Sequence, residues 1–135
     1  MSHGWNVTTL TSDTEVFRVL ADLYGKRWLC RGQSKRYGGL VPMIDREPRQ
    51  NLSRLEKLKL ERQSIDVFRS TCRFFADPGE ELALSDDIVA LMVLRHYGVP
   101  TRLLDWSTSP WVAAYFATLD HDTEDGEIWS FDEPL

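Results

Sequence analysis

The sequence predicts an α+β domain in which a small mixed sheet is flanked by helices. Segments with helical apolar spacing alternate with two short apolar and aromatic segments, 27–33 and 127–132, that are typical of strands. A further segment, 101–106, is expected to be a short strand or extended chain. This order of elements favours an α+β or mixed domain. Because two or three strands make only a small sheet, we expect the chain to be truncated relative to a larger fold.

Length and composition indicate one globular domain. We assign all 135 residues to it, and expect about twelve flexible residues at the N-terminus. The formal net charge of −5 argues against a broad nucleic-acid surface but is compatible with a local basic pocket. No secretory signal or membrane-spanning run is present, so we expect a cytoplasmic protein with no membrane partner. Cys30 and Cys72 lack metal-ligand spacing, so we interpret them as free thiols and expect no metal.

The first half of the chain is expected to place one strand between two helices. The first helix covers 13–25, with Thr11, Ser12 or Asp13 as cap and Gly25 at its end. After the strand 27–33, residues 34–50 mix Gly, Pro, Lys and Arg without a period, which indicates an irregular loop. The second helix is predicted over 52–75. Its expected apolar face consists of Leu52, Leu55, Leu58, Ile65, Phe68 and Phe75.

The second half is expected to hold two helices and the last strand. After a break at 76–81, Asp86 is the expected cap of a helix over 87–97, which Gly98 and Pro100 terminate. A further helix over about 110–119 is predicted, with Pro110 near its first turn. A polar turn at 120–126 then leads into the strand 127–132. The apolar stripe of the 87–97 helix is predicted to be Ile88, Leu91, Met92 and Leu94.

Arg31 is the first candidate functional residue, because it lies inside an apolar strand where an unpaired charge is costly. It is expected either to form a structural pair, with Asp105 as an obvious partner, or to bind a phosphate or another ligand. Gly32 allows a ligand or another backbone to come close. Gln33 adds an amide that both donates and accepts hydrogen bonds.

A second group of candidates follows the predicted helix 87–97. His96 is explained either by the helix dipole or by a site, and we favour a site because so many polar and aromatic residues follow it. The Gly98-Val99-Pro100 reversal brings that group back against the helix end. Arg102 and Asp105 are able to pair across a turn. The expected ligand-binding residues of this group are Tyr97, Thr101, Arg102, Asp105 and Trp106.

The segment Ser107-Thr108-Ser109 has two compatible interpretations. These residues cap the following helix, or their hydroxyls face a ligand at its N-terminus. Trp106 either stacks on a flat ring or packs in the core. Glu61, Glu124 and Glu127 are the acidic candidates, and a solvated charge is the simpler interpretation of Glu61.

Four stretches of the chain form a recognisable set: W-L-C-R-G-Q at 28–33, L-V-P-M-I-D-R at 40–46, H-Y-G-V-P-T-R-L-L-D-W-S-T-S-P at 96–110 and A-A-Y-F-A at 113–117. Together they resemble the FRG domain family, named for an aromatic-Arg-Gly motif. The resemblance covers most of the chain, from about Val16 to Phe131. Cys30 stands where the family has an aromatic residue, and Arg95 stands where a glutamine often precedes the histidine.

A weaker resemblance to ADP-ribosyltransferases implies an ADP-ribosyltransferase-like core and NAD as substrate. It implies that Arg31 holds a phosphate or ribose, and that Ser107 and Thr108 hold the nicotinamide ribose. Tyr97 or Trp106 would stack on the ring. Such an enzyme would act as a toxin, a modifier or an effector in phage defence. The alternative is a non-catalytic nucleotide-binding or regulatory interaction module.

The transferase resemblance also requires a carboxylate that holds the ribose hydroxyl. Glu127 precedes a strand, as such a glutamate would, although it follows the helix closely and the transferase order has another strand first. The alternatives are a catalytic glutamate beyond Leu135 in a longer form of the chain, no such glutamate, or Glu61 as a less favoured substitute. We therefore expect Arg31, His96 and Glu127 to be the catalytic candidates. The acceptor is expected to be a nucleotide or a protein.

Overall fold

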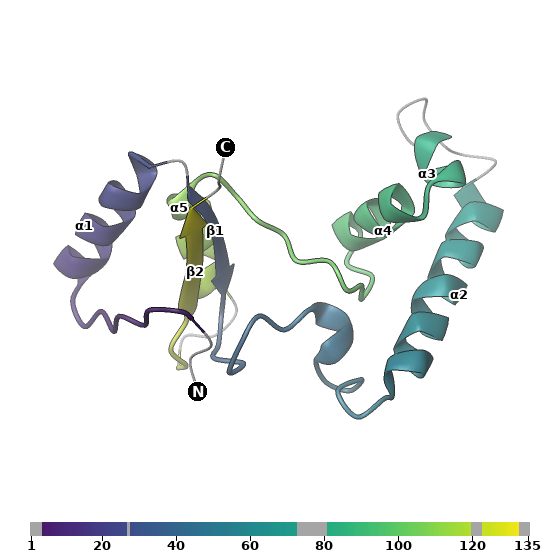
Figure 1. Cartoon of the computed structure of the whole chain (residues 1–135), viewed down its shortest axis with the longest axis horizontal. Helices are drawn as coiled ribbons and strands as arrows, with labels where there is room; N and C mark the ends of the chain where they lie inside the picture. Colours follow the sequence, from purple (N-terminus) through teal and green to yellow (C-terminus); the bar gives the residue numbers. More distant parts are fainter. Residues whose placement is uncertain (1–3, 27, 73–80, 120–122, 133–135) are drawn as a thin grey trace. The chain divides into compact units, whose positions relative to one another are not determined.

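A computed structural model describes residues 4–26, 28–72, 81–119 and 123–132 (Figure 1). The described residues form five α-helices, one short 3-10 helix and two strands, which is the α+β class that the sequence predicts. In chain order the elements are α1 (Asp13–Tyr24), β1 (Trp28–Gln33), η1 (Met43–Asp45), α2 (Arg54–Cys72), α3 (Glu81–Ser85), α4 (Asp87–His96), α5 (Pro110–Thr118) and β2 (Glu127–Asp132).

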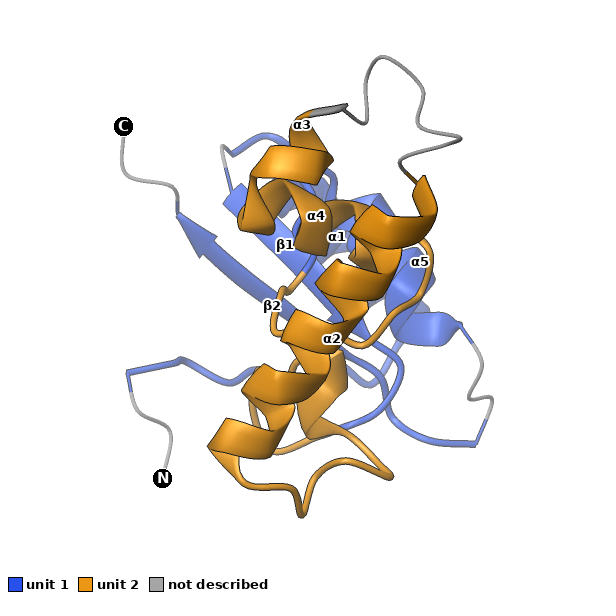
Figure 2. Ribbon diagram, turned by 90° about the vertical axis from the view of Figure 1, so that its right-hand side faces the viewer, with its two compact units in different colours: residues 1–36, 105–135 blue, residues 37–104 orange. Residues whose placement is uncertain are grey.

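The chain divides into two compact units. Unit 1 consists of residues 1–36 and 105–135, and holds α1, α5 and both strands (Figure 2). Unit 2 consists of residues 37–104 and holds η1, α2, α3 and α4. The expectation of a single domain over 1–135 stays a prediction.

Unit 1 is built on an antiparallel pair of strands. Arg31 lies opposite Trp129, and Gln33 lies opposite Glu127. The other edge of β1 forms a two-way backbone bridge, in which the Cys30 amide donates to Ser107 O at 2.7 Å and the Ser107 amide donates to Cys30 O at 2.8 Å. Residues 101–106 are therefore the extended chain that was one of their two expected forms, and the bridge lies just after them at Ser107.

Two glycines let α5 lie directly on one face of this sheet. A Cβ atom at Gly32 would lie 1.8 Å from Ala113 O, and one at Gly126 would lie 2.1 Å from Ala117 O. Both distances are far below van der Waals contact, so only a residue without a side chain fits at either position. The close neighbour that Gly32 admits is thus a helix backbone.

Unit 2 has its own apolar core, formed where α2, α3 and α4 meet. The Asp86 carboxylate caps α4 as predicted, accepting from the amides of Ile88 at 2.7 Å and Val89 at 3.0 Å. Ser53 and Glu56 form a capping box at the start of α2, because each side chain accepts the other residue's backbone amide. The buried core consists of Ile65, Phe68, Ala83, Ala90, Leu91 and Leu94.

The predicted apolar faces of α2 and α4 are only partly buried. Leu55 and Leu58 of α2 are exposed, and so are Ile88 and Met92 of α4. Length explains the difference on α2, because its 19 residues span about 28 Å whereas the ten residues of α4 span about 15 Å. Because α4 is about half as long as α2, it covers only part of the apolar face of α2. The sequence did not predict α3, and Phe75 lies outside the described residues.

Candidate functional site

Three predicted site residues share one face of the unit 1 sheet. Side chains alternate along a strand, so Gly32 faces α5 while Arg31 and Gln33 point to the opposite side. The antiparallel register places Glu127 on the same side as Gln33. We call Arg31, Gln33 and Glu127 the polar sheet face.

Hydrogen bonds fix the polar sheet face. Gln33 is only 3% exposed, and its Nε2 donates to Glu127 Oε1 at 2.7 Å. Arg31 is 7% exposed, and its Nη1 donates to the backbone carbonyl of Asp105 at 2.8 Å. The structure therefore brings a cation, an amide and a carboxylate together on neighbouring strands. Glu127 is the more accessible of the three.

Aromatic rings pack beside the polar sheet face. Trp106 meets Phe131 edge to face, with ring centroids 4.8 Å apart. Trp5 meets Trp129 in the same way at 5.0 Å. Trp106 thus has a packing partner of its own, as its core interpretation requires, and it remains partly exposed beside the face.

Ser107 and Thr108 differ in their surroundings. Ser107 lies opposite Cys30 in the bridge, and its Oγ accepts from the Ser109 amide at 3.0 Å, just before α5 begins at Pro110. Ser109 is the N-cap residue of α5. Thr108 is exposed. The Ser107 hydroxyl therefore helps to organise the start of the helix.

Arg102 lies in unit 2 and is held by a carboxylate from α2. Its backbone amide donates to Glu61 Oε1 at 2.6 Å, its Nε donates to Oε2 at 2.6 Å, and its Nη2 pairs with the same carboxylate oxygen. Glu61 is 3% exposed, so the solvated-charge interpretation of this residue is wrong. The carboxylate is buried because it satisfies a backbone donor and a guanidinium at once.

Thr101 is fully enclosed in unit 2, with 0% exposure. Its carbonyl accepts from the Ile44 amide at 3.3 Å, and its Oγ1 accepts from the Leu103 amide at 3.3 Å. These contacts tie the segment after Pro100 to η1. In the structure Thr101 therefore stabilises the segment after Pro100 through these hydrogen bonds.

His96 and Tyr97 end α4, and both are exposed. Their rings meet edge to face with centroids 5.3 Å apart. With Val89, Met92 and Val93 they line a shallow hollow of about 450 Å³. The structure thus divides the predicted site residues. His96, Tyr97, Thr101, Arg102 and the acidic candidate Glu61 belong to unit 2, and the others belong to unit 1.

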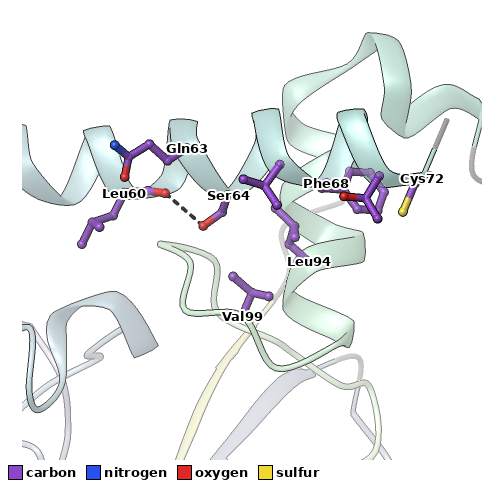
Figure 3. A pocket seen from close by; sticks show the side chains of 9 residues that line it. Leu60, Gln63, Ser64, Phe68, Cys72, Leu94 and Val99 are labelled. Atoms are coloured by element: carbon purple, nitrogen blue, oxygen red, sulfur yellow. Dashed lines mark hydrogen bonds between the residues drawn. The ribbon is translucent and has the colours of Figure 1, made fainter.

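Unit 2 also carries an apolar groove of about 470 Å³ that the sequence did not predict (Figure 3). Ser64 Oγ donates to Leu60 O at 2.9 Å, which turns the hydroxyl back onto its own helix. The groove is lined by Leu60, Gln63, Ser64, Val67, Phe68, Thr71 and Cys72 of α2, together with Leu94 and Val99. None of the predicted site residues lines it.

The buried thiol of Cys30 has a perturbed pKa. Burial raises the pKa of the Cys30 thiol, so this cysteine is held in its neutral form. Both cysteines are free thiols.

Within the described ranges, no three His, Cys, Asp or Glu side chains gather closely enough to hold a metal ion. In the same ranges, no helix has the length and apolar character needed to cross a bilayer.

Sequence reasoning missed the role of Glu61 as the partner of Arg102. One signal was present, since Glu61 lies four and seven residues before the buried Ile65 and Phe68, and so falls in their helical phase. The partner could not be read from spacing, because the two residues are 41 positions apart.

Comparison with known proteins gives one match. Residues 26–126 match the model of the FRG domain, which is about three quarters of the chain. The match includes β1, α2, α4, α5 and the extended segment between α4 and α5. Searches of curated proteins and of solved structures found no match.

Proposed function

The chain belongs to the FRG domain family, and from this premise we propose that the polar sheet face of unit 1 binds NAD and supports ADP-ribosyl transfer. One observation carries the proposal. The Glu127 carboxylate is fixed by the buried Gln33 amide at 2.7 Å, on the same sheet face as Arg31. A positioned carboxylate can stabilise the positive charge that develops on a ribose as its glycosidic bond breaks, and a guanidinium on the same sheet face can bind the pyrophosphate of a dinucleotide.

In the proposed reaction, the bond between ribose C1′ and the nicotinamide nitrogen breaks, and nicotinamide leaves with the bonding electron pair. A nucleophilic oxygen or nitrogen of the acceptor, or water, forms the new bond to C1′ and loses its proton. Glu127 would accept a hydrogen bond from a ribose hydroxyl and so stabilise the positive charge that develops on the sugar. Arg31 would bind the pyrophosphate.

The remaining unit 1 residues would have supporting roles. Gln33 would keep the Glu127 carboxylate in one orientation. Trp106 would stack on a ring of the ligand, and Ser107 and Thr108 would contact the nicotinamide ribose near the start of α5. Consumption of NAD or modification of a target in this way would suit a toxin or an effector in phage defence.

A second candidate function is non-catalytic binding of a nucleotide or regulation through interaction. The burial of Arg31 favours it, because a guanidinium that is 7% exposed and bonded to the Asp105 carbonyl at 2.8 Å is well placed to brace the fold. In that case nucleotides would bind without turnover, or would not bind at this face.

The decisive experiment measures nicotinamide release from NAD, a readout that needs no knowledge of the acceptor. Glu127→Gln keeps an acceptor oxygen for Gln33 but removes the charge, so we expect release to fall by about 100-fold while NAD binding persists. Glu124→Gln is the matched control, since Glu124 is an exposed carboxylate in the preceding turn. Equal release by the wild type and Glu127→Gln would rule out the catalytic role of Glu127.

Thermal unfolding with and without NAD separates the two candidate functions. A rise in Tm with NAD but no nicotinamide release would favour non-catalytic binding. If NAD causes no rise in Tm and no nicotinamide is released, NAD is refuted as the ligand. Arg31→Lys discriminates further, because a brace would lose stability without ligand, whereas a phosphate contact would lose mainly the NAD-dependent rise in Tm.

A further inference from the structure

Unit 1 exposes five aromatic side chains along α1 and α5. We define the aromatic surface as Phe17, Tyr24, Trp111, Tyr115 and Phe116, whose exposed fractions range from 39% to 65%. α5 carries no charged residue, although only Pro110, Ala113 and Ala117 of this helix are buried. A helix that is apolar all round is normally covered on all sides.

Ring contacts and helix spacing relate the residues of the aromatic surface to one another. Phe17 of α1 contacts Trp111 of α5 with ring centroids 5.8 Å apart, and Tyr115 contacts Phe116 at 5.4 Å. Trp111 and Tyr115 are four residues apart and therefore adjacent on α5. Tyr24 is seven residues after Phe17, so the two lie on the same side of α1. Exposed apolar surface of this kind marks an interaction site.

We propose that the aromatic surface is the interface of a symmetric homodimer. Area and charge both support a second copy of the chain as the occupant. An aromatic side chain offers about 200 Å², and about half of each is exposed, so five residues offer roughly 500 Å² per copy. Two copies would bury roughly 1,000 Å², which is at the threshold for a biological interface and in the size range of weak, reversible ones.

The charge distribution suits self-association. In a two-fold dimer the same patch meets itself, so any charge at its centre would face a like charge. The α5 part of the surface has none, and this permits contact between two copies although each chain has a net charge of −5. Tryptophan and tyrosine are also the residues that most often dominate interface energy.

The test measures oligomeric state by sedimentation over a range of protein concentrations. We expect a monomer–dimer equilibrium, which Tyr115→Glu weakens by about 30-fold or more because it buries a charge at the interface. Val67→Glu is the matched control, since Val67 is an equally exposed apolar residue on a helix and lies in unit 2. It should leave the dimer unchanged.

A second variant guards against loss of folding. Tyr24→Lys places a cation at the C-terminal end of α1, where the helix dipole favours it, so the helix stays stable while the surface gains a charge. Folding of each variant is checked by circular dichroism. Weakening by Tyr115→Glu and Tyr24→Lys but not by Val67→Glu supports the proposal. A monomeric wild type, or a dimer that Val67→Glu also weakens, overturns it.

Discussion

Replacing Gly32 with alanine should disrupt the contact between the sheet and α5. The added Cβ would lie 1.8 Å from Ala113 O, 2.8 Å from Ala113 C and 2.7 Å from the Ala117 amide nitrogen. All three are backbone atoms of a helix, so no side chain can rotate out of the way. Carbon and oxygen atoms need about 3.3 Å, so α5 would have to retreat by about 1.5 Å.

The expected cost follows from two opposing effects. Overpacking a tightly packed contact usually costs about 1–3 kcal/mol and occasionally more, and a rigid backbone neighbour favours the upper part of that range. Alanine also restricts the unfolded chain, which offsets about 0.4–1 kcal/mol. We therefore expect unit 1 to lose about 1–2.5 kcal/mol of its free energy of unfolding.

Tryptophan fluorescence during urea unfolding measures this loss directly. The chain has five tryptophans, at positions 5, 28, 106, 111 and 129, and all of them belong to unit 1. Gly25→Ala is the matched control, because Gly25 has φ −74° and its added Cβ would lie 3.8 Å from the nearest atom, Asp22 O. The control should be neutral or slightly stabilising. A Gly32→Ala variant within about 0.5 kcal/mol of the wild type would refute the close approach of α5.

Three further predictions concern unit 2 and can be followed by circular dichroism. Glu61→Ala should cost about 1–3 kcal/mol, because it leaves the Arg102 amide without its acceptor while the half-exposed Arg102 guanidinium is solvated, whereas substitution of the exposed Glu47 should have little effect. Asp86→Ala should cost about 1 kcal/mol through loss of the α4 cap, and an unchanged stability would argue against that cap. Hydrogen bonds from Ser53 lower the pKa of Glu56, so its contribution to stability is present above its unfolded pKa and is lost as the pH falls through the folded value. Glu56→Gln should therefore flatten the acid limb of the stability–pH curve, and an unchanged curve would contradict this linkage.

Local signals predicted most of the elements. Ser12, Gly25, Asp86 and Pro110 act through atoms within a few residues of themselves, so the starts and ends of α1, α4 and α5 could be placed from the sequence. Long-range geometry could not be placed in this way. Gly32 was expected to admit either a ligand or another backbone, and only the position of α5 decides between these two neighbours.

The relative positions of the candidate site residues could not be predicted from the sequence either. Arg31, Gln33 and Glu127 were each selected from sequence, but their common face depends on the register of two strands that are far apart in the chain. Arg102 was predicted to bind a ligand or to pair with Asp105, and its carboxylate in the structure comes from Glu61 of α2. Charged residues have several chemically equivalent partners, and only tertiary structure selects one.

The two free cysteines, one in each unit, can report separately on the unfolding of the two units. Cys30 belongs to unit 1 and is 1% exposed, whereas Cys72 belongs to unit 2 and is partly exposed at the end of α2. A thiol reagent should therefore modify Cys72 quickly and Cys30 only when the strand pair separates. The ratio of the two labelling rates under increasing urea would reveal whether the units open in one step or in sequence.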